Sequence, residues 1–244
     1  SALACLLALL CFCALLAQFY SPIFWHMAGF LGVTSAMIIL LLAHYRPATQ
    51  RLNDRANTAI FAYPTKPILM LVALTLSAML LEGAGTDWSV IFMRDIFSTP
   101  PFISGMAFAL GALSQFIVRF FADRFVDQYG PEKITSYSVI ALGIGVTLVT
   151  FAPLPLIALG GFVLLGAGNA VIFPLAISAA AQRTDRPASV NVAAVAQLSF
   201  IVFLLAPPFL GIVAEQFGIR SAFGICFPLV ILSWFSVKSL RAPQ

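Results

Sequence analysis

Long apolar runs divide this chain and are separated by short polar or proline-containing breaks. Eight runs are long enough to cross a membrane, because a spanning helix needs about 20 mostly apolar residues. They cover approximately residues 2–19, 24–43, 67–92, 102–121, 134–152, 155–179, 189–213 and 219–238. Such continuous runs predict helices rather than the short alternating segments of a membrane barrel. The expected fold class is therefore an all-α integral membrane bundle of about eight transmembrane helices.

The composition supports a lipid environment. Of the 244 residues, 61% are hydrophobic and 9% are charged, whereas soluble domains carry about 25% charged residues. We find no basic cluster interleaved with aromatics, so a nucleic-acid partner is not expected. The four cysteines lie in apolar runs without the spacing of a metal site, so we expect no metal, no cofactor and no structural disulfide; they are Cys5, Cys11, Cys13 and Cys226.

Basic residues are distributed unequally between the two sets of alternating loops. Eleven of the thirteen Lys and Arg residues fall on one set, and only Arg94 and Arg220 fall on the other. The basic set is expected to face the cytoplasm, which places both chain ends there and suggests the bacterial inner membrane. The eleven are Arg46, Arg51, Arg55, Lys66, Arg119, Arg124, Lys133, Arg183, Arg186, Lys238 and Arg241.

One long polar stretch interrupts the apolar pattern. Residues 46–66 include Arg51, Asn53 and Asp54 and predict a cytoplasmic interdomain linker. The predicted organisation is a pair of helices in 1–45, the linker, and a six-helix bundle in 67–244.

Glu82 is an ionisable residue at the end of an apolar run. Such a residue costs several kcal/mol in a spanning segment unless it faces protein or water. It is therefore a candidate proton acceptor or solute-binding group; the alternatives are a carboxylate that pairs with a neighbouring helix and one that sits in the membrane interface. Gly83 and Gly85 follow and could let the helix unwind or let another helix approach. Asp87 lies about 7.5 Å further along the helix, nearer the outer surface, and is a further candidate for the solute or proton pathway. Trp88 is either an interfacial aromatic or a stacking partner for the solute.

Three amides, Gln115, Asn169 and Gln197, lie within apolar helices. Each could line a cavity, although hydrogen bonding between helices is the commoner use of such residues. Asn169 is followed by Pro174 in a stretch rich in small residues, which favours close packing and a bend.

Arg119, Asp123, Arg124 and Asp127 form the densest charge group and precede Gly130. Arg119 and Asp123 are four residues apart and can pair on a helix face, but taken alone the group indicates a short solvated loop. Phosphate-binding glycine loops, zinc pairs and nucleophile elbows are missing from the sequence, so an enzyme is not expected.

The segment from Arg119 to Gly130 resembles the cytoplasmic loop signature of the major facilitator superfamily. Asp123-Arg124 supplies the acid–base pair, although Arg119 and Val126 stand where the family usually has glycine. Three further segments resemble the seventh, tenth and eleventh helices of the fucose-permease-like (sugar permease) branch; these are 82–89, 169–178 and 206–211.

The resemblance implies that the chain holds family helices 5 to 12 of a twelve-helix fold and would work with preceding helices. It implies secondary transport of a small polar solute, such as a sugar, by alternating access, with proton coupling as a further hypothesis. Glu82, Gln115, Asn169 and Gln197 would line the solute path, and Asp123 or Asp127 would gate its cytoplasmic side at a helix N-terminus of the other bundle. The alternative is a non-transporting membrane sensor or assembly protein on the same bundle.

Overall fold

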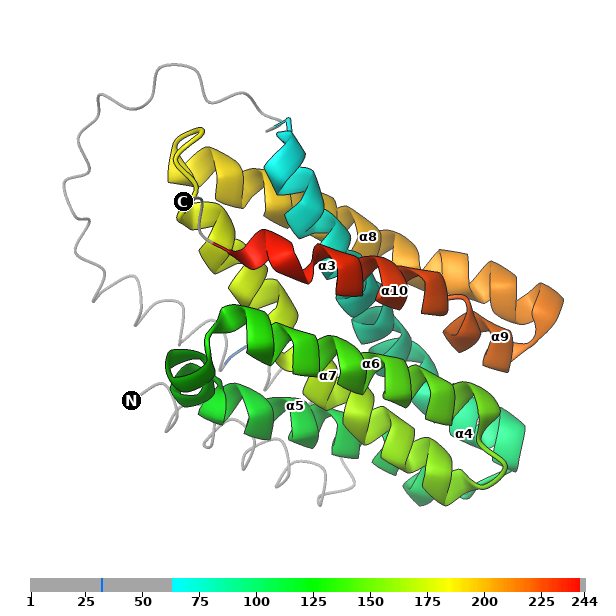
Figure 1. The fold of residues 1–244 in the computed structure, drawn as a ribbon. Coiled ribbons are helices and arrows are strands. Elements are labelled where there is room, and N and C mark those ends of the chain that lie inside the picture. Colours follow the sequence, from blue (N-terminus) through cyan, green and yellow to red (C-terminus); the bar gives the residue numbers. More distant parts are fainter. Residues whose placement is uncertain (1–31, 33–62, 242–244) are drawn as a thin grey trace. The chain divides into compact units, whose positions relative to one another are not determined.

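The computed structural model describes Gly32 and residues 63–241, and every regular element in this range is a helix (Figure 1). The chain divides into two units, Ser1–Thr58 and Ala59–Gln244, and the bundle described below belongs to the second. The predicted helices at 2–19 and 24–43, and most of the predicted linker at 46–66, lie outside the described residues.

Six helical spans in the described range are long and apolar enough to cross a membrane. They confirm the all-α class and the six spans predicted between residues 67 and 238. The first span joins α3 (Lys66–Gly83), the π-helical segment η2 (Ala84–Trp88) and α4 (Ser89–Phe97); it is followed by α5 (Pro101–Tyr129), α6 (Pro131–Phe151), α7 (Pro155–Ala181) and α8 (Ala188–Phe217). The last span joins α9 (Ile219–Gly224), α10 (Phe227–Ser236) and the 3₁₀ turn η3 (Val237–Leu240).

Proline and glycine set the helix boundaries. The helices α5, α6 and α7 each begin at a proline, where the missing N–H has no helical partner to lose. Gly130 and Gly218 follow α5 and α8 with φ angles of 83° and 85°, a conformation that glycine adopts without strain. Each therefore turns the chain within a single residue and starts the next helix.

Helix α7 packs most extensively against α6 and α5, and it also contacts α3. Its approach to α5 is closest at Gly166, where a Cβ atom would overlap the carbonyl oxygen of Gly111. Small residues let membrane helices approach closely and gain dispersion contacts that lipid does not provide. This crossing holds α5 and α7 together beneath the polar site described in the next section.

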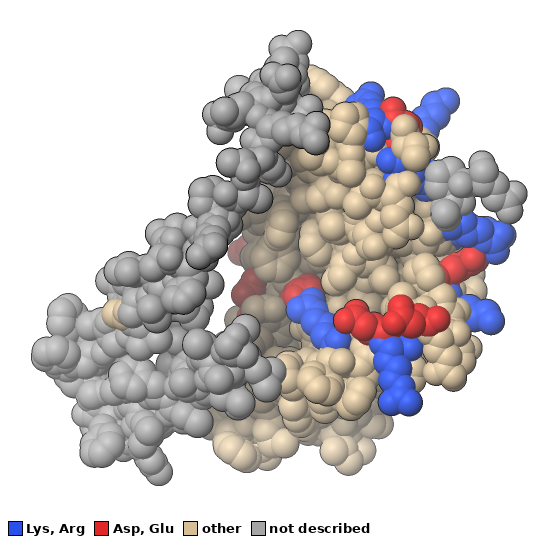
Figure 2. All heavy atoms as spheres, turned by 90° about the vertical axis from the view of Figure 1, so that its left-hand side faces the viewer, with Lys and Arg blue, Asp and Glu red and all other residues tan. Residues whose placement is uncertain are grey.

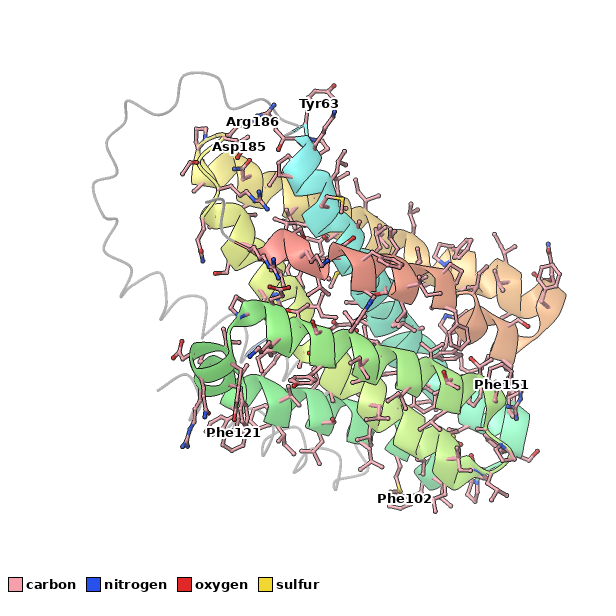
Figure 3. The ribbon with its side chains drawn as sticks, viewed as in Figure 1. Tyr63, Phe102, Phe121, Phe151, Asp185 and Arg186 are labelled. Carbon is pink, nitrogen blue, oxygen red and sulfur yellow. The ribbon has the colours of Figure 1, made fainter. Side chains whose placement is uncertain are left out.

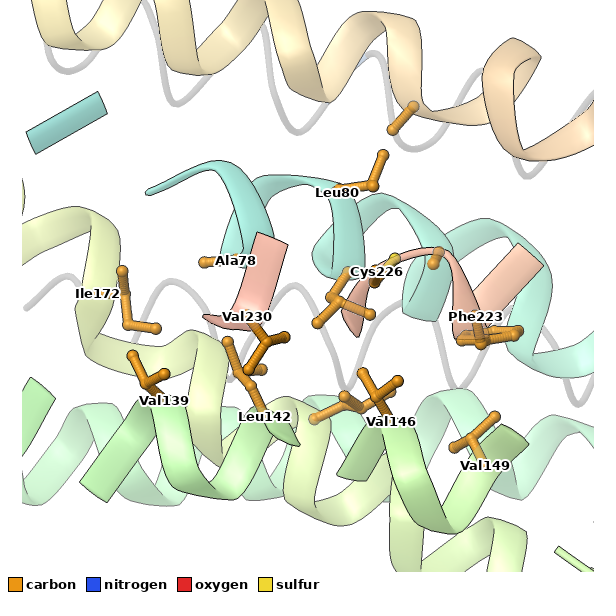
Figure 4. Close-up of a cluster of buried hydrophobic side chains, with 14 of the residues drawn as sticks. Ala78, Leu80, Val139, Leu142, Val146, Val149, Ile172, Phe223, Cys226 and Val230 are labelled. Atoms are coloured by element: carbon orange, nitrogen blue, oxygen red, sulfur yellow. The ribbon is translucent and has the colours of Figure 1, made fainter. Parts of the chain in front are cut away.

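A buried apolar cluster fills the space between α3, α6, α7 and the last span (Figure 4). Leu142, Ile172 and Val230 are among its members, and the free thiol of Cys226 is buried with them. At one end, the rings of Phe92, Phe162 and Phe223 meet edge to face with centroids 5.4 to 5.8 Å apart. Edge-to-face pairs stabilise packing by about 0.5–1.5 kcal/mol beyond burial.

Charged side chains lie at both ends of the bundle and make different contacts there. At one end, Arg220 donates to the Thr150 carbonyl (2.9 Å) and lies 5.8 Å from the Phe92 ring, while Arg94 pairs with its neighbour Asp95 in solvent. At the opposite end, Tyr63, Asp185 and Arg186 lie together (Figure 3). Figure 2 looks from the left-hand side of Figure 1 and shows the basic and acidic side chains on that face.

Candidate functional site

The carboxylate of Glu82 lies on the last turn of α3 and contacts α5. Gln115 donates from Nε2 to Oε1 of Glu82 at 3.1 Å. The Glu82 side chain is 27% exposed, so it is largely enclosed by protein while keeping an open side. The structure therefore contains the predicted pairing with a neighbouring helix, and the functional role of Glu82 stays a prediction.

Arg119 lies one turn beyond Gln115 on α5 and contacts both α7 and α3. Its Nε donates to the carbonyl oxygen of Ala170 at 3.0 Å, and its Nη2 lies 4.0 Å from Oε1 of Glu82. The second distance is too long for a hydrogen bond, so the guanidinium acts on Glu82 through its charge. The structure thus turns Arg119 toward Glu82 and Ala170 rather than toward Asp123, the pairing that sequence spacing allowed.

The Ala170 carbonyl is free to accept this bond because residue 174 is proline. In an α-helix the acceptor at 170 would receive the N–H of residue 174, and Pro174, inside α7, has no N–H to give. A carbonyl left without a donor in the membrane interior costs free energy. Arg119 supplies the missing donor, so a break in the α7 ladder fixes the guanidinium beside Glu82.

Asn169 of α7 forms hydrogen bonds with the backbone of α3 next to Glu82. In the amide orientation that satisfies both of its ends, its nitrogen donates to the Ala78 carbonyl at 3.2 Å and its oxygen accepts from the Glu82 backbone N–H at 3.3 Å. The residue is buried. Asn169 thus forms the predicted bond between helices and also lines the pocket around Glu82.

The first span changes its helical geometry immediately after Glu82. The π segment η2 occupies Ala84–Trp88, and Thr86 donates its hydroxyl to the Glu82 carbonyl at 2.8 Å. Single π turns inside α-helices occur frequently at functional sites. The glycines at 83 and 85 were expected to let the helix unwind or to let another helix approach. The helix widens by one residue and continues as α4, and α8 approaches Gly83, where a Cβ would lie 3.1 Å from the Cβ of Ala206.

A small pocket joins these groups. Glu82, Gln115 and Asn169 line it together with Thr86, Phe108 and Phe162, and its volume is about 50 Å³. That space holds water, which needs roughly 10–15 Å³, but it is well below the ~300–1,000 Å³ of a site for a drug-sized ligand. As formed by residues 63–241, the pocket is large enough for water or a hydronium ion but too small for a whole sugar.

Three of the predicted pathway residues, Asp87, Trp88 and Gln197, lie outside the pocket lining. Asp87 is exposed on η2, and Gln197 is half-buried on α8. Trp88 is half-buried, and its ring packs over Gly211 of α8, 3.5 Å from where a Cβ would lie. The structure therefore gives Trp88 a packing contact between helices.

The predicted gating loop is a helix in the structure. Asp123, Arg124 and Asp127 are exposed on the last two turns of α5, and Gly130 alone separates α5 from α6. The prediction of a loop here was wrong because no helix-breaking residue occurs before Gly130, so the helix continues for 29 residues. At ~1.5 Å per residue it is longer than a ~30 Å hydrocarbon core, and its charged turns can reach water.

A family model for the major facilitator superfamily matches residues 70–243. The chain belongs to the major facilitator superfamily. The matched region contains every site residue described above.

Curated relatives agree with this assignment. The chain is 27% identical over 197 residues to an uncharacterised MFS-type transporter of Yersinia pestis, covering 81% of this chain and 51% of that protein. It is 27% identical to an uncharacterised transporter of Sinorhizobium fredii, covering 66% of this chain and 43% of the relative. It is also 27% identical to the membrane protein MosC of Rhizobium meliloti, covering 64% and 38%. The chain thus spans about half or less of these relatives.

Proposed function

We propose that this major facilitator is a proton-coupled secondary transporter of a small polar solute, such as a sugar or a related metabolite. The described bundle forms one wall of the solute path and rocks against an N-terminal bundle, as the pseudo-symmetric halves of this fold do. In this proposal the chain corresponds to family helices 5 to 12 of the fucose-permease-like branch. Its basic loops and both of its ends face the cytoplasm of a bacterial inner membrane.

One observation carries the proposal: the Glu82 carboxylate lines a water-sized pocket inside a membrane span. It accepts a hydrogen bond from Gln115 at 3.1 Å and lies 4.0 Å from a cation. In this proposal Glu82 is the group that binds the transported proton, and its attraction for Arg119 depends on its charge. Proton binding is thereby linked to the contact between α3 and α5.

The proposed exchange of a proton and a solute at Glu82 follows from how its carboxyl group forms hydrogen bonds in each protonation state. Ionised Glu82 only accepts, whereas protonated Glu82 offers one O–H donor. A single hydroxyl group of a solute that lies outside the small pocket can donate to the first form or accept from the second, so a proton and one solute hydroxyl share the same carboxyl in this proposal. Gln115 and Asn169 hold the carboxyl and the backbone at residue 82 in place during either state.

The test uses the full-length protein reconstituted in liposomes that contain a pH-sensitive dye. A panel of monosaccharides, including L-fucose, is added outside, and acidification of the lumen is recorded with labelled-sugar uptake. We expect Glu82→Gln to abolish solute-driven acidification. Gln115→Leu removes a hydrogen bond to a charged group, worth about 1.5–3 kcal/mol, and should reduce uptake by roughly tenfold or more.

Glu215→Gln is the matched control, since Glu215 is an exposed carboxylate on α8 away from the pocket. It should leave both signals within twofold of wild type. Uptake without acidification in the wild type would overturn the coupling, and unchanged acidification in Glu82→Gln would overturn the role of this residue. A wild-type protein that moves none of the sugars would overturn the proposed solute class.

A further inference from the structure

A second cavity lies on the outer surface of the bundle, where α5 and α6 form its sides and α7 forms its floor. Its volume is about 310 Å³, which falls in the ~300–1,000 Å³ range of ligand sites. It exists because α5 and α6 both pack closely on α7 but make few contacts with each other. Ala141 on α6 and Ala167 on α7 line it, and their small side chains leave the groove open.

The walls of this groove are apolar and aromatic. Phe121 and Phe125 of α5 and Tyr137 of α6 line it, with Phe121 46% and Tyr137 65% exposed. Figure 3 shows Phe121 projecting outward from the lower side of the bundle. Large exposed apolar side chains on a membrane span suit lipid or another apolar helix as a neighbour. A tyrosine among them suits a position where one end is apolar and the other wet.

Toward the turn between α5 and α6, a basic residue lies beside each wall of the groove. On α5, Arg124 continues the row of Ile117 and Phe121 at helical spacings of four and three residues. On α6, Lys133 lies one turn before Tyr137. In the part of the chain that the structure describes, neither cation belongs to an ion pair. Two positive charges therefore flank the same end of an apolar groove.

The neighbouring carboxylates do not cancel these charges. By helical spacing, Asp123 falls on the side of α5 away from the groove. Asp127 is three residues from Arg124 but forms no ion pair with it among the described residues. Glu132, which precedes Lys133, is bound by Arg241, with Nε and Oε2 2.7 Å apart. The end of the groove thus keeps a net positive character and suits an anion.

We propose that this groove binds one acyl chain of an anionic phospholipid, with the lipid phosphate held between Arg124 and Lys133. The apolar walls take the hydrocarbon, the two cations take the phosphate, and Tyr137 spans the boundary between them. A second copy of this chain fits less well, because a two-fold contact brings each patch against itself and would place four cations together. The groove lies on the opposite side of α5 from Asp123, and it is separate from the pocket around Glu82.

The experiment is a native mass-spectrometry titration of the delipidated full-length protein in detergent. The probes are phosphatidylglycerol and phosphatidylcholine with identical acyl chains. We expect phosphatidylglycerol to bind with one preferred site, and Arg124→Gln combined with Lys133→Gln to weaken that binding about tenfold. The control combines Lys66→Gln with Lys238→Gln, which removes two exposed lysines outside the groove and should change binding by less than twofold.

A second variant tests the hydrocarbon part of the site without changing charge. Ala141→Phe fills the groove and should lower phosphatidylglycerol binding, whereas Ala109→Phe on an exposed face of α5 should not. Equal binding of the two lipids, equal losses in both double variants, or full binding in Ala141→Phe would each overturn the proposal.

Two further outcomes concern other occupants of the groove. A dimer mass without lipid would assign the groove to a second copy, and a wild type that takes up no phosphatidylglycerol would show that another segment of the protein covers it. Both outcomes would overturn it as well.

Discussion

Arg119 donates to the one carbonyl of α7 that Pro174 deprives of its helical partner, that of Ala170, at 3.0 Å. The relationship connects a break in one helix to the position of a charge on another. Because the guanidinium is held at Ala170, its Nη2 stays 4.0 Å from the Glu82 carboxylate. Pro174 therefore acts as a positioning residue for Arg119, without touching Glu82 itself.

The first prediction concerns Pro174→Ala. Alanine restores an N–H four residues after Ala170, and the repaired helical bond competes with Arg119 for the same carbonyl. Proline inside a helix costs about 3 kcal/mol, so we expect the variant to melt at a higher temperature than wild type. We expect its solute uptake to fall several-fold, because the released guanidinium leaves Glu82. Thermal unfolding in detergent and liposome uptake measure the two effects.

A double-mutant cycle with Arg119→Gln checks the mechanism. If Pro174 acts through Arg119, the uptake losses of the two single variants will not add, because both remove the same contact. Additive losses would show that Pro174 acts by another route. A Pro174→Ala protein with wild-type uptake would contradict the positioning role directly.

The spans of this major facilitator could be predicted because lipid imposes a simple rule on the sequence. Backbone groups must bond within the segment and side chains must be apolar, so run length alone located α5 to α8. The end of α5 could not be found this way, since Arg119 to Tyr129 carry charge yet remain helical. Hydropathy reports where the membrane ends, whereas a helix ends where backbone chemistry changes, here at Gly130.

The candidate site was partly visible in the sequence for a related reason. Glu82, Gln115 and Asn169 are polar residues in apolar helices, and such rare residues converge because each needs a partner out of water. Which residues pair depends on how α3, α5 and α7 cross, and no single run contains that information. The role of Ala170 was hidden because a backbone carbonyl carries no signature of its own; its spacing from Pro174 was the available clue.

A second prediction concerns pH and the loop between α7 and α8. Asn191 and Thr65 donate to the two carboxylate oxygens of Asp185 at 2.8 and 2.9 Å, and these hydrogen bonds hold the pKa of Asp185 below its usual value. The folded protein thus keeps Asp185 ionised to a lower pH than the unfolded chain does, whose aspartates have a pKa of about 3.9. The stabilisation is fully present above that value and is lost as pH falls through the folded pKa.

Asp185→Asn should therefore melt below wild type at pH 7, and the difference should shrink as pH falls from about 5 to 3. Melting curves across this range in detergent measure the effect. Glu215→Gln, an exposed carboxylate on α8 outside the ion pairs of the described residues, should run parallel to wild type at every pH. A constant offset between Asp185→Asn and wild type down to pH 3 would contradict the linkage.

The last prediction concerns the crossing that brings the site together. A Cβ on Gly166 of α7 would overlap the Gly111 backbone of α5, whereas a Cβ on Gly160, also on α7, would meet open space. Gly166→Ala must push α5 away and should destabilise the bundle by about 1–3 kcal/mol or more. Gly160→Ala is the matched control and should be neutral or stabilising by about 0.5–1 kcal/mol, since alanine favours helices. Because α5 carries Gln115 and Arg119, Gly166→Ala should also lower uptake in the folded fraction. Equal melting temperatures for the two variants would mean that α5 and α7 do not depend on this contact.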